Sequence, residues 1–165
     1  NDTISSNLGI FAIDLFYDAS LKNDNVLSIY AGYFNYNFGK GYIRNIGAMN
    51  SANGNTDATV LNGAGSAFPM IGTGQIGYAQ IGYSFHNKKG KQRIMPYTSI
   101  MIADYDKLNN NMIYTDTGMN LFIDNHYAKL TLAYQNRPIF MGNYNNGFDQ
   151  KTYKGSFVTQ FQIMF

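Results

Sequence analysis

The chain contains the stretch Gly155-Ser-Phe-Val-Thr-Gln-Phe-Gln-Ile-Met-Phe165, in which polar and apolar residues largely alternate. Because successive side chains of a strand point to opposite sides, this stretch predicts a strand with two unlike faces. One face holds Phe157, Thr159, Phe161, Ile163 and Phe165, and the other holds Ser156, Val158, Gln160, Gln162 and Met164. Two settings use such a strand. It can be half buried in a soluble sandwich, or it can form part of the wall of a membrane β-barrel.

The aromatic residue at position 165 favours the second setting by resemblance. A strand that stops on an aromatic carboxy-terminal residue resembles the closing strand of bacterial outer-membrane β-barrels. The resemblance implies that Phe165 and Phe161 belong to a membrane-insertion signal, which the barrel-insertion machinery reads. It also implies that the apolar face meets outer-membrane lipid and that the protein resides in the bacterial outer membrane.

The composition is consistent with a membrane barrel. The 165 residues suit one domain, and only 13% of them are charged, about half the share of a soluble domain. Aromatic residues make up 16% of the chain, and all of them are Tyr or Phe. Mean hydropathy is −0.26, and no apolar run approaches the length of a transmembrane helix. Without Cys there is no disulfide framework, and a net charge of +2 gives no argument for nucleic acid.

Alternating stretches predict an all-β, antiparallel transmembrane β-barrel portion spanning residues 1–165 with about seven strands. The expected strands are residues 8–18, 26–37, 73–86, 92–103, 115–124, 126–137 and 153–165. Each has about 10 to 14 residues, enough to cross a bilayer at a tilt, whereas strands of globular proteins average about half that.

The connections between these stretches alternate in length. Long loops are expected at residues 38–72, 104–114 and 138–152, and short turns at residues 19–25, at residues 87–91 and at Asn125. Outer-membrane barrels have short periplasmic turns and long external loops, so the long loops are expected outside the cell. Seven is an odd number, whereas bacterial single-chain barrels have an even number of strands. We therefore expect the chain to be the carboxy-terminal portion of a larger barrel, unless a strand lies unrecognised within residues 1–8 or 38–72.

The segment Thr117–Pro138 carries a closer resemblance. It contains Gly118, Asn120 and Phe122, then His126, then Lys129, Leu130, Leu132, Tyr134 and Gln135. This order resembles the last hairpin of porins of the phosphate-selective porin O/P type, particularly those of Bacteroidota, over residues 115–165. The resemblance implies a homo-trimeric porin of roughly 16 strands that is general or anion-preferring. One long loop of a porin often folds into the lumen, and by analogy residues 38–72 are a candidate.

The polar face of the expected strands supplies candidate pore-lining residues. They are Arg93, Asp116, Asn120, Lys129, Gln135, Arg137, Lys154, Gln160 and Gln162. Opposed charges and amides along water would tune ion passage through their local field. Alternatively, these side chains pair with one another or hydrate an inner wall. Arg137 and Lys154, near the expected outer ends, are candidates for attracting anions.

The sequence shows no catalytic set, and no enzyme activity, metal or other cofactor is expected. His86 and His126 are the only histidines, and without Cys a zinc site is improbable. The acidic, Asn-rich residues 104–111 lack the spacing of a calcium loop. We expect a porin for passive diffusion of small hydrophilic solutes. The alternatives are a non-conducting structural or docking barrel of an outer-membrane secretion or surface-protein complex, and the end of a TonB-dependent transporter barrel.

Overall fold

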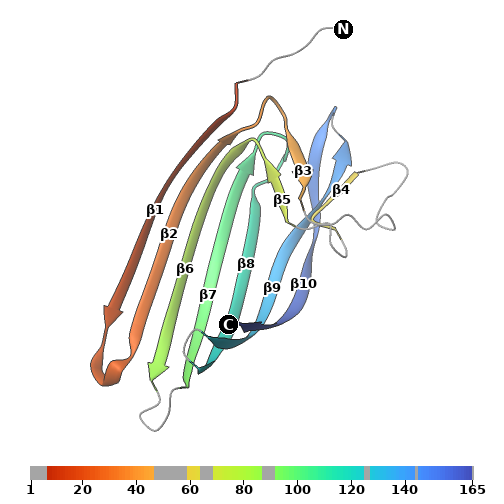
Figure 1. The fold of residues 1–165 in the computed structure, drawn as a ribbon. Helices are drawn as coiled ribbons and strands as arrows, with labels where there is room; N and C mark the ends of the chain where they lie inside the picture. The colour runs from red at the N-terminus through yellow and green to blue at the C-terminus, as the bar shows by residue number, and fades with distance from the viewer. Residues whose placement is uncertain are drawn as a thin grey trace.

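The computed structural model describes residues 7–46, 59–63, 69–86, 92–124, 127–143 and 145–164. Seven long strands form one sheet in which every neighbouring pair is antiparallel, in the order β1-β2-β6-β7-β8-β9-β10 (Figure 1). They are β1 (Gly9–Ser20), β2 (Val26–Asn37), β6 (Gly74–His86), β7 (Arg93–Tyr105), β8 (Met112–Asp124), β9 (Ala128–Asn143) and β10 (Gly147–Ile163). The predicted all-β class and antiparallel sheet are confirmed. Among the described residues, β1 and β10 each pair with one long strand, so the sheet is open at both edges.

Among the described residues between β2 and β6, three short strands occur. They are β3 (Ile43–Asn45), β4 (Thr59–Leu61) and β5 (Met70–Gly72). β3 pairs with β5, and β4 pairs with the far end of β9. A single 3-10 turn, η1 (Lys22–Asp24), joins β1 to β2. None of the described residues forms a helix that is long and apolar enough to cross a membrane.

Each long strand overlaps one expected range, but the expected loop 138–152 is mostly strand and the expected loop 104–114 is partly strand. β9 and β10 continue as a paired hairpin through residues 138–152, with a register shift between Gln150 and Thr152. β7 and β8 likewise extend into residues 104–114. The expected alternation of loop lengths is therefore wrong at these two places, and the long connection that remains joins β2 to β6. The end of the β9–β10 hairpin extends past the last residues of β9 that pair with β8. Its strands need no continuous apolar face there. The alternation of polar and apolar residues is therefore weaker in this part of the sequence.

The pairing register sorts the side chains onto two faces, because directly paired residues lie on the same side of a sheet. Leu15, Ala31, Ala79, Ile100 and Thr115 form one continuous row across β1, β2, β6, β7 and β8. This side is the apolar face. Its exposed members include Phe11, Ile13, Leu15, Ile29, Tyr33, Ile81, Phe85, Ile94, Ile100, Ile102, Ile113, Met119, Leu132, Tyr134, Phe157 and Phe161.

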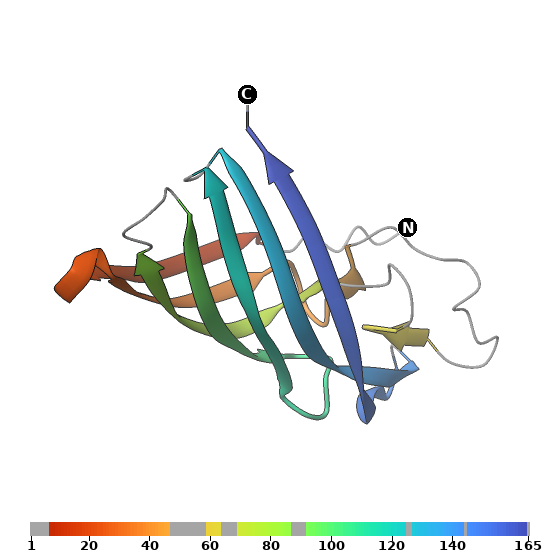
Figure 2. The same cartoon turned by 90° about the horizontal axis from the view of Figure 1, so that it is seen from below.

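The other side is the polar face, and the sheet as a whole is curved (Figure 2). On β6 and β7 the side chains of this face are less exposed than their neighbours on the apolar face, whereas β1 is exposed on both faces. At the end of the sheet where β2 leads into β3, apolar side chains gather into a core. Its members are Ile43, Leu61, Met70, Ile76, Ala103, Tyr105, Leu108, Met112, Phe140 and Phe148.

This core shows where the long connection lies. Ile76, Ala103, Tyr105 and Met112 belong to the polar-face rows of β6, β7 and β8. The core residues Ile43, Leu61 and Met70 come from β3, β4 and β5. The described parts of residues 38–72 therefore pack against the polar face.

Candidate functional site: the polar face

The nine candidate pore-lining residues all lie on the polar face. Arg93, Phe122, Lys129 and Gln162 form one row across β7, β8, β9 and β10, and Asn120, Thr131 and Gln160 form the adjacent row. Asp116 pairs with Gln135, and Arg137 pairs with Lys154. The register thus gathers side chains from four strands on one curved surface. Among the nine, Gln135 donates a hydrogen bond to Asp116, which is the kind of pairing that the alternative interpretation expects.

Asp116 is the centre of a hydrogen-bonded group in the middle of this face. Tyr97 Oη donates to one carboxylate oxygen of Asp116 at 3.0 Å, and Gln135 Nε2 donates to the other at 2.8 Å. The three residues come from β7, β8 and β9. Each acceptor oxygen of the carboxylate therefore has a donor from a neighbouring strand, which fixes the orientation of the Asp116 side chain.

A second polar contact lies closer to the short turns. Thr131 Oγ1 donates to Asn120 Oδ1 at 2.6 Å between β9 and β8. Beyond it, Arg93 and Asp18 line a hollow of about 350 Å³, together with Met95 and Phe122. A cation from β7 and a carboxylate from β1 therefore border the same hollow on the polar face.

Arg137 has surroundings that the sequence did not indicate. Its side chain is buried, with 5% of its surface exposed. Nε donates to the carbonyl oxygen of Asn62 at 3.2 Å, Nη2 to the carbonyl oxygen of Gly63 at 3.0 Å and Nη1 to Ser156 Oγ at 3.3 Å. Arg137 was expected to lie at an open mouth of the pore. The structure instead places it in a buried position, bound to residues 62 and 63. Nothing in the sequence near Arg137 signals this contact, because its partners lie more than seventy residues earlier in the chain.

The segment that Arg137 binds is also held from its other side. Asn45 Nδ2 donates to the carbonyl oxygen of Val60, and the backbone N–H of Asn62 donates to Asn45 Oδ1, each at 3.2 Å. Asn62 has a φ of 56°, a left-handed conformation that Asn tolerates better than most residues. Its side chain is fully buried, and its Nδ2 lies 3.2 Å from Met112 Sδ. Residues 59–63 are thus held in a defined position on the polar face.

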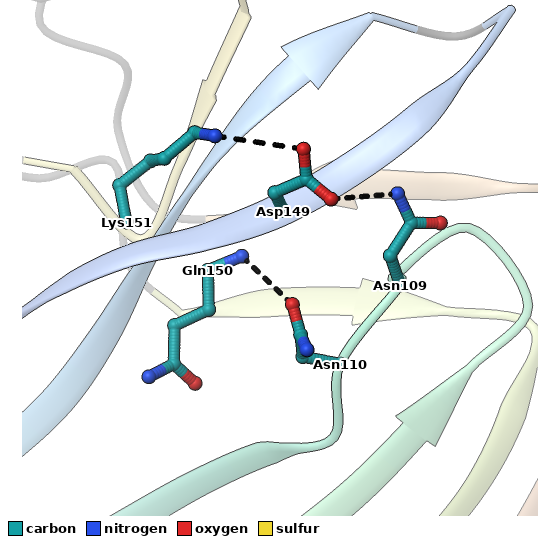
Figure 3. A network of polar contacts seen from close by, with 5 residues as sticks. All are labelled: Asn109, Asn110, Asp149, Gln150 and Lys151. Atoms are coloured by element: carbon teal, nitrogen blue, oxygen red, sulfur yellow. Dashed lines mark hydrogen bonds and ion pairs between the residues drawn. The ribbon is translucent and has the colours of Figure 1, made fainter.

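Loops at the same end of the sheet are joined by polar contacts, which Figure 3 shows from close by. Asn109 Nδ2 donates to Asp149 Oδ1 at 2.8 Å, and Lys151 Nζ lies 3.5 Å from Asp149 Oδ2. The backbone N–H of Gln150 donates to Asn110 Oδ1 at 3.2 Å. The hydrogen bond from Asn109, and next the positive charge of Lys151, lower the pKa of Asp149. These contacts tie the tip of the β9–β10 hairpin to the β7–β8 connection.

The remaining candidate residues are placed as follows. Phe161 is 58% exposed on the apolar face, whereas Phe165 and His126 lie outside the described residues. The backbone N–H of His86 donates to Asn25 Oδ1 at 2.9 Å. Among the described residues, no group of three or more His, Cys, Asp or Glu side chains is placed to hold a metal ion.

The geometry therefore offers a curved polar surface of amides, charges and tyrosines, backed by an exposed apolar surface. Comparison with protein-family models, with curated proteins and with solved structures finds no match to this chain.

Proposed function

We propose that this sheet is part of the wall of a bacterial outer-membrane porin, through which small hydrophilic solutes diffuse passively. The observation that carries the proposal is the apolar face, an exposed band of large apolar side chains that crosses all seven long strands. Ile13 is 61% exposed, Ile81 46% and Phe157 89%. An apolar surface of this extent is rare on soluble monomers and marks contact with another apolar phase or a partner. A barrel wall presents such a band to lipid and a polar surface to its lumen.

The lengths of the strands support contact with a bilayer. The seven long strands have 12 to 17 residues. A strand of 13 residues, such as β6, is about 43 Å long at about 3.3 Å per residue. Tilted by about 45°, it rises about 30 Å, the thickness of the hydrocarbon core.

Two hydroxyl groups on the apolar face are paired in a way that suits lipid. Thr98 and Thr117 lie directly opposite each other on β7 and β8, and their Oγ1 atoms are 2.8 Å apart. Each hydroxyl thereby has a partner without water. An unpaired hydroxyl in hydrocarbon would be unfavourable by several kcal/mol, on the order of 4 to 8 in the most apolar solvents.

The open edges of the sheet support a larger assembly. Unpaired backbone N–H and C=O groups are not tolerated in hydrocarbon, so in a bilayer β1 and β10 need further strands beside them. We propose a closed barrel of roughly 16 strands that assembles as a trimer. Phe161 and Phe165 act as its signal to the insertion machinery, and Arg93, Lys129 and Lys154 are the cations that give it an anion preference.

Conductance in a planar lipid bilayer tests this function. The protein should produce stepwise increases in current, and a salt gradient should give a reversal potential of the sign for anion preference. Membrane insertion without current steps would reject the porin proposal. It would favour a non-conducting structural or docking barrel, which the packing of β3, β4 and β5 against the polar face also suits.

The segment on the polar face provides a second test of conduction. Deletion of residues 51–65 removes β4 and the carbonyl groups that Arg137 binds. If this segment narrows the lumen, the deletion should raise single-channel conductance. A deletion variant that inserts normally and has unchanged conductance would show that the segment does not restrict flow.

A further inference from the structure

We infer that Arg137 is a positioning residue: its guanidinium holds residues 59–63, here called the strap, across the polar face and thereby sets the width of the opening. The inference rests on the proposed function, because an opening matters only if solutes pass. Arg137 therefore has a different role from the other cations of the polar face. Arg137 binds a segment of its own chain, whereas a residue that attracts anions must present its charge to water.

The contacts of the guanidinium carry the first step. Two of its nitrogens donate to two consecutive carbonyl groups of the strap, those of Asn62 and Gly63, and a third reaches Ser156 on β10. The planar guanidinium presents its donors in a fixed fork, which lets one side chain bind two adjacent acceptors. Lysine has a single nitrogen and cannot span both carbonyl groups with the same geometry.

The strap is bound at both ends and along its length. Asn45 binds Val60 and Asn62, and β4 pairs with β9 through Thr59–Gly142, Val60–Met141 and Leu61–Phe140. Leu61 and Phe140 are both in the core. Apolar packing therefore holds the start of the strap, whereas the carbonyl groups of its last two residues depend on Arg137.

The charge of Arg137 is balanced by partners other than the residue opposite it in the sheet. Lys154 is its direct partner on β10, and two like charges opposite each other in a sheet are unfavourable. The carbonyl dipoles of Asn62 and Gly63 give the guanidinium favourable partners on the side of the strap. With 5% of its surface exposed, Arg137 offers little charge to a passing anion, and Lys154, which is only partly buried, is better placed to do so.

The experiment compares Arg137→Gln with Lys154→Gln, the same substitution at its direct partner on β10, in planar bilayers. Arg137→Gln should release Asn62 and Gly63, raise single-channel conductance and increase the noise of the open channel. Lys154→Gln removes a charge from the same row, and it should reduce anion preference without the rise in conductance and noise that release of the strap produces. Arg137→Lys keeps the charge but not the fork, and it should resemble Arg137→Gln. If Arg137→Gln instead lowers anion preference at unchanged conductance, Arg137 acts through its charge and the inference is wrong.

A rescue experiment separates positioning from charge. The chain has no Cys, so Val60→Cys with Met141→Cys introduces a single possible disulfide between β4 and β9. Val60 is only two residues before Asn62, so oxidation of this pair in the Arg137→Gln background should limit the movement of the released end and return conductance towards the wild-type value, and reduction should reverse the effect. Equal conductance of the oxidised and the reduced protein would overturn the inference.

Amide exchange gives a readout that does not depend on conduction. Backbone N–H groups of Leu61 and Asn62 should exchange faster in Arg137→Gln than in Lys154→Gln, in detergent as well as in lipid. If the wild-type protein carries no current, the proposed function fails, and exchange still decides whether Arg137 holds the strap. Equal exchange in the two variants would reject that role.

Discussion

At the scale of single residues, the polar face is ordered by side chains that bind across strands. Asp116 accepts hydrogen bonds from Tyr97 and Gln135, and Thr131 binds Asn120. Such contacts need both partners, because a buried donor or acceptor that loses its partner keeps its desolvation penalty. Asp116, Gln135 and Asn120 therefore stabilise the sheet as well as lining its polar face.

Replacement of Asp116 by Ala tests this support. The substitution removes the acceptor of both Tyr97 Oη and Gln135 Nε2, and it should lower the free energy of unfolding by about 1 to 3 kcal/mol. Urea unfolding in lipid vesicles measures the change. Asp104→Ala, at an exposed carboxylate on β7, is the matched control and should shift the free energy by less than about 0.5 kcal/mol. Equal effects of the two substitutions would contradict a specific role for Asp116.

Arg137 marks the limit of what sequence alone could predict at this scale. Alternation placed it correctly on the polar face, since the side of a residue follows from strand parity. Its burial depends on Asn62 and Gly63, which approach only because the chain between β2 and β6 folds back over the sheet. A pattern of period two contains no information about such a distant contact, so the residue looked like a cation at an open mouth.

At the scale of elements, the β9–β10 hairpin is the part that differs most from expectation. Pro138 and the polar residues Asp149, Gln150 and Lys151 suggested a loop. Pro138 is tolerated because it lies beyond the last described pair between β9 and β8, Asn136 with Thr115, so no ladder bond on that side is lost. The hairpin is instead held by contacts to the β7–β8 connection, including the backbone N–H of Phe148, which donates to the carbonyl oxygen of Lys107 at 2.9 Å.

The docking of this hairpin should depend on pH through Asp149, which lies in its tip. Its pKa in the folded protein is lowered, first by the hydrogen bond from Asn109 and then by Lys151. A lowered pKa means that the ionised carboxylate stabilises the docked tip above the unfolded pKa of about 3.9. This stabilisation is lost as the pH falls through the lower, folded value.

Amide exchange at Phe148, corrected for the intrinsic pH dependence of exchange, measures the docking of the tip. Protection should be constant near neutral pH and should fall in the acid range below about 3.9. Asp149→Asn cannot ionise, so its protection should not show this acid transition. An identical acid transition in the Asn variant would assign the effect to another group.

At the scale of the whole molecule, two adjacent residues of β6 test the assignment of the faces. Ile81 lies on the apolar face and Gln80 on the polar face. Arginine at position 81 would enter hydrocarbon and should destabilise the folded, membrane-inserted protein by about 2 to 4 kcal/mol near the midplane. Arginine at position 80 would remain on the polar side and should be tolerated.

Folding into lipid vesicles, followed by the gel mobility of unheated samples, compares Ile81→Arg with Gln80→Arg. The expected result is reduced insertion for the first and normal insertion for the second. Equal insertion of both variants would contradict a lipid-facing apolar surface. Recovery of the wild-type protein from the aqueous fraction without detergent would indicate a soluble sheet.

The long strands could be predicted because most of them have two unlike faces, which imposes an alternation along the sequence. Alternation also excludes a register shift by one residue, which would exchange the faces, but it does not choose between registers two residues apart. The short strands β3, β4 and β5 could not be predicted, because three residues are too few for a period to appear. Closure of the sheet depends on the strands that pair with the free edges of β1 and β10. The side-chain patterns of β1 and β10 do not specify those strands.

The directions of the two edge strands have a consequence for how such a wall can grow. Six antiparallel pairings separate β1 from β10, so the two edges run in the same direction. Duplication of a hairpin adds two strands and leaves that relation unchanged. A second copy in the same orientation would meet this one edge to edge in parallel pairing. A seamless antiparallel ring around this sheet therefore requires an odd number of added strands.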